Sequence, residues 1–485
     1  MQDIGHVALT AATERSRARR VGFAALGAAC ALVPALAMWG FTVDDALIPI
    51  RYAHHLAHGL GYRFDAQGPS TDGVTPLPWS FVLAPLAGGS SVATLLRAKV
   101  LGIVAWTLAG AALGARVGAA AEGRARVGLA GGALVVMGLA FAIGAWAASG
   151  LETGVATALA TLAVTRSRRP LQVAALAGLA ASLRPELVVW AVTVAAGTAL
   201  AAGPTVAGAP ARGRRAALVG AAVAFAPFAV CALVRLAIFG RPAPLAVLAK
   251  PSDLTHGGLY VGAALLVVLT PLLVCAPLAL WRARGLALAI VVAFAAHAAT
   301  VAAAGGDWMP YARLLVPVAP SLVLAFVEIS KVTKPAWSAA RLATALVLGV
   351  LLAWRAAPAG RGVYQDRADL IARARPALDG AHVVAALDIG WVSAATEARI
   401  VDLAGLTDPS IALLPGGHTS KRVDVSMLLD RGVDTVLVYS EMRAVEARLL
   451  RSDLFRSRFE ESTHLPLGPR GAFYVVYRLR TARDP

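Results

Sequence analysis

The stretch VGFAALGAACALVPALAMWG (residues 21–40), followed directly by FTVDDALIPIR (residues 41–51), decides how the rest of the chain is read. The first segment carries no charge and is long enough to cross a bilayer as one helix. The second places two adjacent carboxylates, Asp44 and Asp45, at the end of that helix. An ionisable group beside hydrocarbon costs several kcal/mol, so the pair is by default a functional-site hypothesis.

The composition is that of an integral membrane protein. The chain has 485 residues, of which 58% are hydrophobic and 15% are charged. Soluble domains have about 45–50% apolar and about 25% charged residues. Runs of roughly 20 apolar residues recur before the composition becomes mixed, and each is long enough to span a membrane. We therefore expect a polytopic α-helical membrane protein with a small α/β domain at its C-terminus.

The basic residues predict the topology. Arg15, Arg17, Arg19 and Arg20 hold the N-terminus inside, and later Arg and Lys clusters recur two crossings apart. We expect about eleven transmembrane helices, near residues 21–40, 92–117, 128–148, 151–166, 171–184, 186–203, 216–238, 259–281, 285–304, 314–330 and 338–356. An odd number of crossings puts the C-terminus outside. The predicted divisions are a basic cytoplasmic N-terminus (1–20), a membrane domain (21–358) with its first external loop (41–91), and an extracytoplasmic domain (359–485).

The last segment has the alternating pattern of an α/β domain. Helices are predicted at residues 363–378, 427–431 and 443–459, and strands at 382–387, 399–403, 435–439 and 472–478. About 125 residues are enough to bury a core of their own.

Several function classes are disfavoured. The net charge of +17 does not indicate nucleic-acid binding, because the Arg residues lie largely in short loops between apolar runs. The cysteines, Cys30, Cys231 and Cys275, lie in apolar segments and form no disulfide framework for the tail. The chain has no phosphate-binding P-loop and no dinucleotide fingerprint after a strand. The basic start reads as a retained signal anchor, and no cleavable signal peptide is expected.

Almost every acidic residue of the membrane portion is predicted on the outer side, so chemistry is expected there. Because nucleotide sugars are absent outside, a transfer reaction needs a donor that is already activated, such as a lipid-linked sugar phosphate. A carboxylate would take the acceptor proton, and Asp44 or Asp45 can supply it. A cation would stabilise the departing phosphate. The outer-face candidates for that cation are Arg51, Arg184, Lys250 and Arg313. Since helical neighbours point about 100° apart, one aspartate would face the cavity and the other would cap a helix or hold a partner.

Several motifs occur in the order found in a known family. DDALIPIRYAHHLAHGLGYRFD (44–65) resembles the pattern DDAYISFRYARNLAEGHGLVFN of bacterial GT-C glycosyltransferases, in the branch that contains the mycobacterial terminal arabinofuranosyltransferases. TDGVTPLPW (71–79) resembles EGYTNPLW of that branch. SGLET, LRPE, the lysine that ends FGRPAPLAVLAK, GGDWMPYARLLVPVAP and ALDIGWVSAATEARIVDLAGLTDPSIA match in order as well. The resemblance covers most of the chain, although PAPLAVLAK replaces the usual PNTFYAK.

The resemblance implies an inverting transfer of a sugar from a polyprenyl phosphate to a hydroxyl of an envelope glycan or lipid. It implies a bacterial plasma-membrane protein with its active site outside, and no cofactor or resident metal, with divalent-ion dependence left open. The family's catalytic aspartate lies in the first external loop, and the residue at that position in this sequence is Asp44, with Asp45 beside it. Substrate or donor-phosphate contacts are expected from the matched motifs, at Arg51, Tyr52, Glu152, Arg184, Lys250, Asp307, Trp308 and Arg313.

Structural roles compete with these assignments. The aspartate pair could cap a juxtamembrane helix, and Arg184 could simply pair with Glu186. Glu152 could be a first-turn acid, Lys250 and Arg313 could extend to the interface, and Trp308 could be an interface anchor. His54, His55 and His58 share a helical face, where solvent exposure, phosphate contact and metal binding are alternatives. For Asp388 and Asp402 we expect structural roles, as turn and strand-end residues, in place of catalytic ones.

Two other functions remain beside the transferase. A transporter or flippase of a lipid-linked sugar would need charges at mid-membrane and internal repeats, and neither is evident. A non-catalytic membrane protein whose outer domain binds envelope glycan would tolerate substitutions in the membrane motifs.

Overall fold

The protein divides into two compact units, and each is built from three segments that are separated in the sequence. The computed structural model describes residues 2–202, 210–249, 253–269, 272 and 283–480. One unit comprises Met1–Trp39, Lys99–Ala229 and Ser252–Arg361, and the other comprises Gly40–Ala98, Val230–Pro251 and Gly362–Pro485. The last segment of the second unit begins at Gly362, and the same unit contains the first loop. The domain boundaries expected from the sequence stay a prediction.

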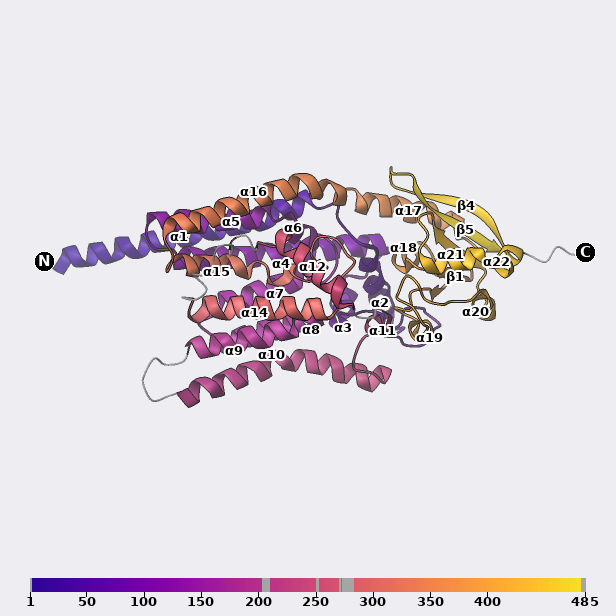
Figure 1. The fold of residues 1–485 in the computed structure, drawn as a ribbon, viewed down its shortest axis with the longest axis horizontal. Helices are drawn as coiled ribbons and strands as arrows, with labels where there is room; N and C mark the ends of the chain where they lie inside the picture. The colour runs from indigo at the N-terminus through magenta and orange to yellow at the C-terminus, as the bar shows by residue number, and fades with distance from the viewer. Residues whose placement is uncertain (1, 203–209, 250–252, 270–271, 273–282, 481–485) are drawn as a thin grey trace, which may run out of the picture. The chain divides into compact units, whose positions relative to one another are not determined.

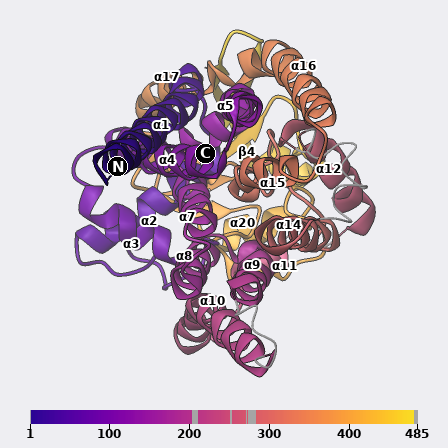
Figure 2. The same cartoon turned by 90° about the vertical axis from the view of Figure 1, so that its left-hand side faces the viewer.

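The first unit is helical throughout its described residues (Figures 1 and 2). Its helices are α1 (Gln2–Ala37), α5 (Arg124–Leu139), α6 (Phe141–Ala147), α7 (Thr153–Thr165), α8 (Pro170–Leu183), α9 (Val188–Ala202), α12 (Leu254–Val267), α14 (Gly285–Ala303), α15 (Ser321–Ser330) and α16 (Pro335–Gly360). Two further helices, α4 (Ser91–Ala120) and α10 (Pro210–Phe239), continue into the second unit. Helices α7, α8, α9 and α14 pack on one another in that order, and α5 packs against α1, α15 and α16.

The long apolar helices of the structure are consistent with the expected multi-pass membrane protein. Among the described residues, six helices are long and apolar enough to cross a bilayer, and a pair bent by 57°, α5 with α6, makes seven. The other four expected spans correspond to shorter apolar helices, α7, α8, α12 and α15. The expected span at 259–281 ends outside the described residues. Eleven crossings therefore stay a prediction.

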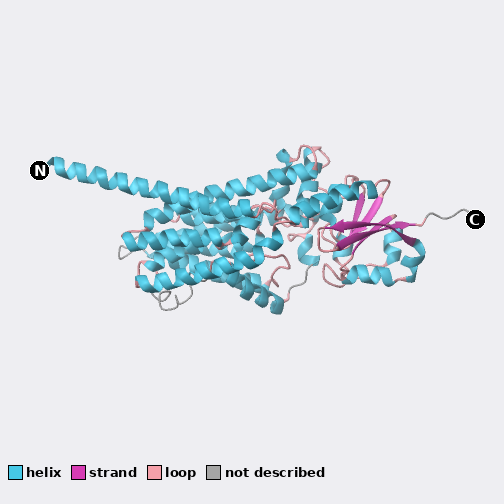
Figure 3. Cartoon of the chain, turned by 90° about the horizontal axis from the view of Figure 1, so that it is seen from above, coloured by secondary structure: helices cyan, strands magenta, loops and turns pink. Residues whose placement is uncertain are grey.

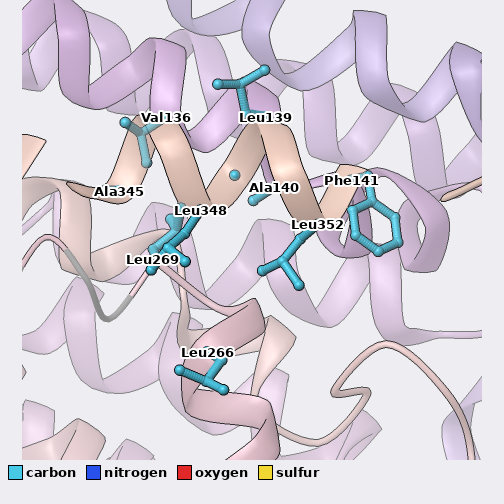
Figure 4. Close-up of a pocket in the computed structure, with 10 residues that line it drawn as sticks. Val136, Leu139, Ala140, Phe141, Leu266, Leu269, Ala345, Leu348 and Leu352 are labelled. Carbon is cyan, nitrogen blue, oxygen red and sulfur yellow. The ribbon is translucent and has the colours of Figure 1, made fainter. Parts of the chain in front are cut away.

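Large apolar side chains point away from the helix packing. Leu108 in α4 is 65% exposed, Leu218 in α10 is 72% exposed and Trp354 in α16 is 76% exposed. Contiguous apolar surface on a soluble monomer would be an aggregation hazard, whereas lipid covers it at no cost. Between α5, α12 and α16 lies a small apolar cavity of about 20 Å³, lined by leucines such as Leu139, Leu266 and Leu348 (Figure 4). It has room for about one water molecule and no polar side chain to hold it.

Small residues bring α1 and α4 into backbone contact. A Cβ atom on Gly114 would lie 2.0 Å from the carbonyl oxygen of Phe23, and one on Gly27 would lie 2.2 Å from that of Gly110. Helices in lipid associate through such close approach, because burying apolar surface gains nothing there. The glycines at these positions are therefore a packing requirement.

The second unit contains a mixed five-stranded sheet, seen in magenta in Figure 3. Its strands are β1 (Val383–Ala386), β2 (Arg399–Asp402), β3 (Thr435–Tyr439), β4 (Phe459–Leu467) and β5 (Ala472–Leu479), in the order β2-β1-β3-β5-β4. The first three are parallel, and β5 is antiparallel to both β3 and β4. The tail helices are α17 (Val363–Ala377), α18 (Ile389–Ala395), α19 (Pro409–Ala412), α20 (Val425–Asp430), α21 (Ala444–Arg451) and α22 (Asp453–Arg458).

The first loop is itself folded. A 3₁₀ turn (Asp44–Ala46) leads into α2 (Leu47–Ala57), and α3 (Leu77–Leu83) packs against α2. Helix α2 also contacts α18, so the first loop packs against the tail within this unit. The tail agrees with the predicted α/β pattern at α17, α20 and four of the strands, but the helix expected at 443–459 is two short helices, and α18, α19 and β4 were not predicted. Glu460 and Glu461, which are adjacent in β4, are both exposed, so the strand lacks the apolar alternation by which a strand is recognised.

We expect Gly114→Val to lower the stability of the folded protein by about 1–3 kcal/mol, because the branched side chain forces α1 and α4 apart. Gly128→Val is the matched control, since a Cβ on Gly128 meets nothing within 4 Å. Thermal unfolding in detergent, followed by size-exclusion chromatography, measures both. Equal losses in the two variants would contradict the close contact.

Candidate functional site

Asp44 is fixed against the first turn of α18. Its Oδ2 accepts the backbone N–H of Gly390 at 2.8 Å, and its Oδ1 accepts that of Trp391 at 2.9 Å. Such first-turn N–H groups have no acceptor inside their own helix. A Cβ on Gly390 would lie 2.1 Å from the Asp44 carbonyl oxygen, so only glycine permits this approach. The carboxylate is buried, with Asp44 8% exposed.

A second carboxylate lies in a charged cluster just before α18. Asp388 Oδ2 accepts hydrogen bonds from Arg443 Nη1 at 2.8 Å and from the Tyr474 hydroxyl at 2.5 Å. Arg367 Nη1 donates to the same hydroxyl at 3.5 Å. Burial and the negative charge of Asp388 raise the pKa of Tyr474, so its hydroxyl keeps its proton and acts as a donor. The cluster gathers α17, β5 and the start of α21 around Asp388.

These surroundings set the protonation of Asp44. Burial raises the pKa of Asp44 to about 7, and the negative charges of Asp388 and Asp45 raise it as well. The positive charge of Arg367 and the N–H of Trp391 act in the opposite direction. A carboxyl group whose pKa lies near neutrality can exchange a proton at physiological pH, which is the property required of a general base.

The two adjacent aspartates differ in their surroundings: Asp44 is the one that holds a partner, and a cavity-facing aspartate stays a prediction. Asp44 holds a partner through both of its oxygens, whereas Asp45 is only half-buried. Each oxygen of Asp44 keeps a second lone pair, because a carboxylate accepts about four hydrogen bonds. Asp44 is therefore anchored and still able to accept a proton.

Arg51 binds carbonyl groups. Its Nε donates to Phe64 O at 2.9 Å and its Nη1 to Ser393 O at 3.0 Å and Thr396 O at 2.9 Å. Its Nη2 reaches Ala398 O at 3.3 Å, and the residue is 4% exposed. The guanidinium thus joins α2 to the loop that follows it and to the end of α18. This arrangement leaves little of Arg51 for a phosphate.

Tyr52 and a buried ion pair shape the rest of the first loop. The Tyr52 hydroxyl bonds Thr71 Oγ1 at 2.9 Å and accepts the N–H of Gly73 at 3.1 Å. Between these two contacts, Asp72 Oδ2 accepts from Arg235 Nε at 2.8 Å. Arg235 lies near the end of α10, and nothing in its apolar surroundings predicted this pairing. The TDGV motif is therefore held from both sides.

In the first unit, the matched SGLET, LRPE and GGDWMPYAR motifs form one charged cluster. Arg184 Nη1 lies 2.8 Å from Glu152 Oε1, and Arg184 Nε donates to Glu186 Oε1 at 2.6 Å. Arg313 lies 3.5 Å from Glu152 and 3.6 Å from Asp307. Three formal negative charges thus surround two positive ones. The expected pairing of Arg184 with Glu186 is present, but Glu152 shares the same arginine.

One atom of this cluster lacks a partner. Glu152 is fully buried, and within the described part of the chain its Oε2 accepts no hydrogen bond. An unsatisfied buried carboxylate oxygen costs about 1–3 kcal/mol or more. A hydroxyl or another donor from a bound molecule would satisfy it.

The loop that carries Arg313 is strained. Tyr311 and Ala312 have φ values of 61° and 54°, in the left-handed region that side chains with a Cβ rarely occupy. Trp146 Nε1 holds this backbone by donating to the Tyr311 carbonyl at 3.1 Å. Trp308 is 53% exposed in the same loop. Strain of this kind, of order 1–3 kcal/mol per residue, tends to gather at functional sites.

The histidines of α2 do not form a metal site in the described structure. His54 bonds Thr94, His55 bonds the Arg63 carbonyl, and His58 bonds the His54 carbonyl. No set of three His, Cys, Asp or Glu side chains fit to hold a metal occurs among the residues described. Lys250, the remaining sequence-based candidate, lies outside the described residues.

Sequence reasoning missed the residues that surround Asp44. Asp388 was read as a turn residue, and Arg367, Arg443 and Tyr474 were not singled out. No local signal marks them, because Asp44 and Gly390 are 346 positions apart in the chain. Only the match of ALDIGWV to a family motif drew attention to this segment.

We expect Arg51→Gln to destabilise the second unit by about 1–3 kcal/mol, because several buried carbonyl groups lose their donor. Arg97→Gln is the control: Arg97 also donates to two carbonyls, but it is exposed and water can replace it. Limited proteolysis and thermal unfolding of the full-length protein report the difference. An Arg51→Gln variant as stable as wild type would contradict this structural role.

The comparisons with known proteins reach only the tail. A family described as a domain of unknown function (DUF8728) matches residues 362–477. No curated protein and no solved structure matches the chain.

Proposed function

We propose that the protein is a membrane glycosyltransferase that moves a sugar from a polyprenyl phosphate to a hydroxyl group of a cell-envelope acceptor. The observation that carries the proposal is Asp44, a buried carboxylate in the first loop whose pKa is raised to about 7 and whose position is fixed by two backbone N–H groups. The resemblance of the ordered motifs to GT-C glycosyltransferases supports the reaction class. In this proposal the first loop and the tail lie on the extracytoplasmic face of the plasma membrane.

The proposed reaction is a single displacement. The acceptor hydroxyl oxygen attacks the anomeric carbon while the bond from that carbon to the phosphate oxygen breaks. Asp44 takes the hydroxyl proton, and the bonding electrons leave with the polyprenyl phosphate. Attack from the face opposite the leaving group inverts the anomeric centre. Asp45, the adjacent and more accessible carboxylate, is the second candidate for the base.

Of the four residues proposed as the cation that assists the leaving phosphate, three already have acceptors within the protein. The guanidinium of Arg51 is bonded to carbonyls, and those of Arg184 and Arg313 face carboxylates. Lys250 stays the sequence-based candidate for this role. Glu152, with one oxygen open, is better suited to a sugar hydroxyl than to a phosphate, because two anions repel each other.

We expect Asp44→Asn to reduce transfer by at least about 100-fold, the low end of what a general base contributes. The assay offers labelled polyprenyl-phosphate arabinofuranose, mannose, glucose or galactose to envelope-glycan acceptors in purified membranes. Asp45→Asn tests the neighbour, and Asp453→Asn, a 96% exposed side chain in α22, is the control. Thermal unfolding of each variant separates loss of chemistry from loss of fold. Loss in Asp45→Asn alone would move the base to Asp45, and transfer that survives both substitutions would overturn the role of the pair.

We expect transfer to fall as the pH is lowered through about 7, by about tenfold per pH unit on the acid side, because protonated Asp44 cannot accept a proton. Stability responds to this group with the opposite sign. Folding raises the Asp44 pKa, so its contribution to stability is complete at low pH and is lost as the pH rises through about 7. An acid loss of activity without acid unfolding would therefore support the assignment. A pH-independent rate between pH 5.5 and 8.5 would contradict it.

A further inference from the structure

A cleft in the second unit has no part in the reaction proposed above. It has a volume of about 380 Å³, within the range of about 300–1,000 Å³ typical of ligand sites. One wall is the first loop between Phe64 and Thr71, and the other is β2 with the turn that leads into α19. Arg431, just after α20, closes one side. Both walls belong to the same compact unit.

The lining is polar and electrically balanced. Asp65 and Asp408 contribute two carboxylates, and Arg399 and Arg431 contribute two guanidinium groups. The formal charges cancel, so the cleft offers many hydrogen-bond donors and acceptors without a net field. A ligand with several hydroxyl groups and no charge matches this lining, whereas a phosphate would meet two carboxylates.

The polar groups are held in place before any ligand arrives. Asp65 Oδ1 accepts the N–H of Ile400 at 3.1 Å. Asp408 Oδ1 accepts the N–H groups of Ser410 at 3.0 Å and Ile411 at 3.2 Å, and Arg431 donates to Asp408 Oδ2. Each of these side chains keeps further donors or acceptors for a ligand. Groups fixed in this way lose little conformational freedom on binding.

Apolar surface completes the cleft. Pro69 and Pro409 line it from opposite walls, and Phe64 contributes beside them. A sugar ring has hydroxyl groups at its edge and C–H groups on its faces, so it needs both kinds of surface. We propose that this cleft binds one or two residues of a neutral oligosaccharide. The binding does not depend on the transferase function, because a protein without catalytic activity would keep the same cleft.

The test measures binding of neutral oligosaccharides to the full-length protein in detergent. The probes are arabinan, mannan, glucan and galactan oligosaccharides, followed by saturation-transfer NMR and by titration calorimetry. Arg399→Ala removes an exposed side chain that lines the cleft, and Ser410→Tyr fills its mouth. Arg422→Ala is the matched control, an exposed arginine of the same domain that does not line the cleft. Thermal unfolding confirms that each variant is folded.

We expect at least one neutral oligosaccharide to bind wild type, and Arg399→Ala and Ser410→Tyr to weaken that binding by about tenfold or more. Arg422→Ala should leave it unchanged, and added inorganic phosphate or glycine should not compete. Absence of binding for every oligosaccharide, or equal affinity in all variants, would overturn the proposal. Competition by inorganic phosphate would reassign the cleft to anions, and competition by glycine would reassign it to zwitterions. Because the assay requires no turnover, loss of transfer in Asp44→Asn with intact binding would separate the two proposals.

Discussion

The second unit depends on one arrangement: a buried carboxylate from the first loop that accepts two backbone N–H groups from the first turn of α18. Removing Asp44 from water is unfavourable, and the two hydrogen bonds, with Arg367 nearby, offset only part of that cost, so the pKa of Asp44 stays raised. The contact also fixes the residue at position 390, since any side chain there would collide with the Asp44 backbone. A segment near the start of the chain and one near its end must therefore fold together before either is complete.

Arg51, which lies in α2 beyond the Asp44 contact, also holds the first loop to α18. One guanidinium satisfies carbonyl groups that end α18 and one that lies in the loop after α2, so helix, loop and tail share a single donor. The planar fork of arginine suits this role better than lysine, which would supply donors from one point. The neutral cleft lies where the same loop meets β2, and the hydrogen bond from the Ile400 N–H to Asp65 joins its two walls.

The sequence predicted the elements more fully than it predicted the contacts between them. Apolar runs marked the long helices, and four of the five strands were recognised, because hydrophobic periodicity is a local property. The strand β4 was not predicted because Glu460 and Glu461 are consecutive, charged and both exposed, so the apolar alternation is missing there. Asp44 was singled out because a carboxylate beside an apolar run is unusual. Its neighbours Arg367, Arg443 and Tyr474 carry no such local mark, and the fold alone brings them together.

The cluster of the first unit shows why the identity of a charged residue does not settle its role. Arg184 and Arg313 were expected to contact phosphate, since guanidinium groups bind phosphate well. In the structure three carboxylates surround them, and the formal sum is negative. An anion entering there would have to displace Glu152 or Asp307, whereas a hydroxyl group could donate to the open oxygen of Glu152 without changing any charge. Arg313 directly follows two residues with left-handed backbone, Tyr311 and Ala312, a conformation that costs about 1–3 kcal/mol per residue. An excess of negative charge disfavours a second anion, whereas a neutral donor can still give a hydrogen bond to a carboxylate oxygen.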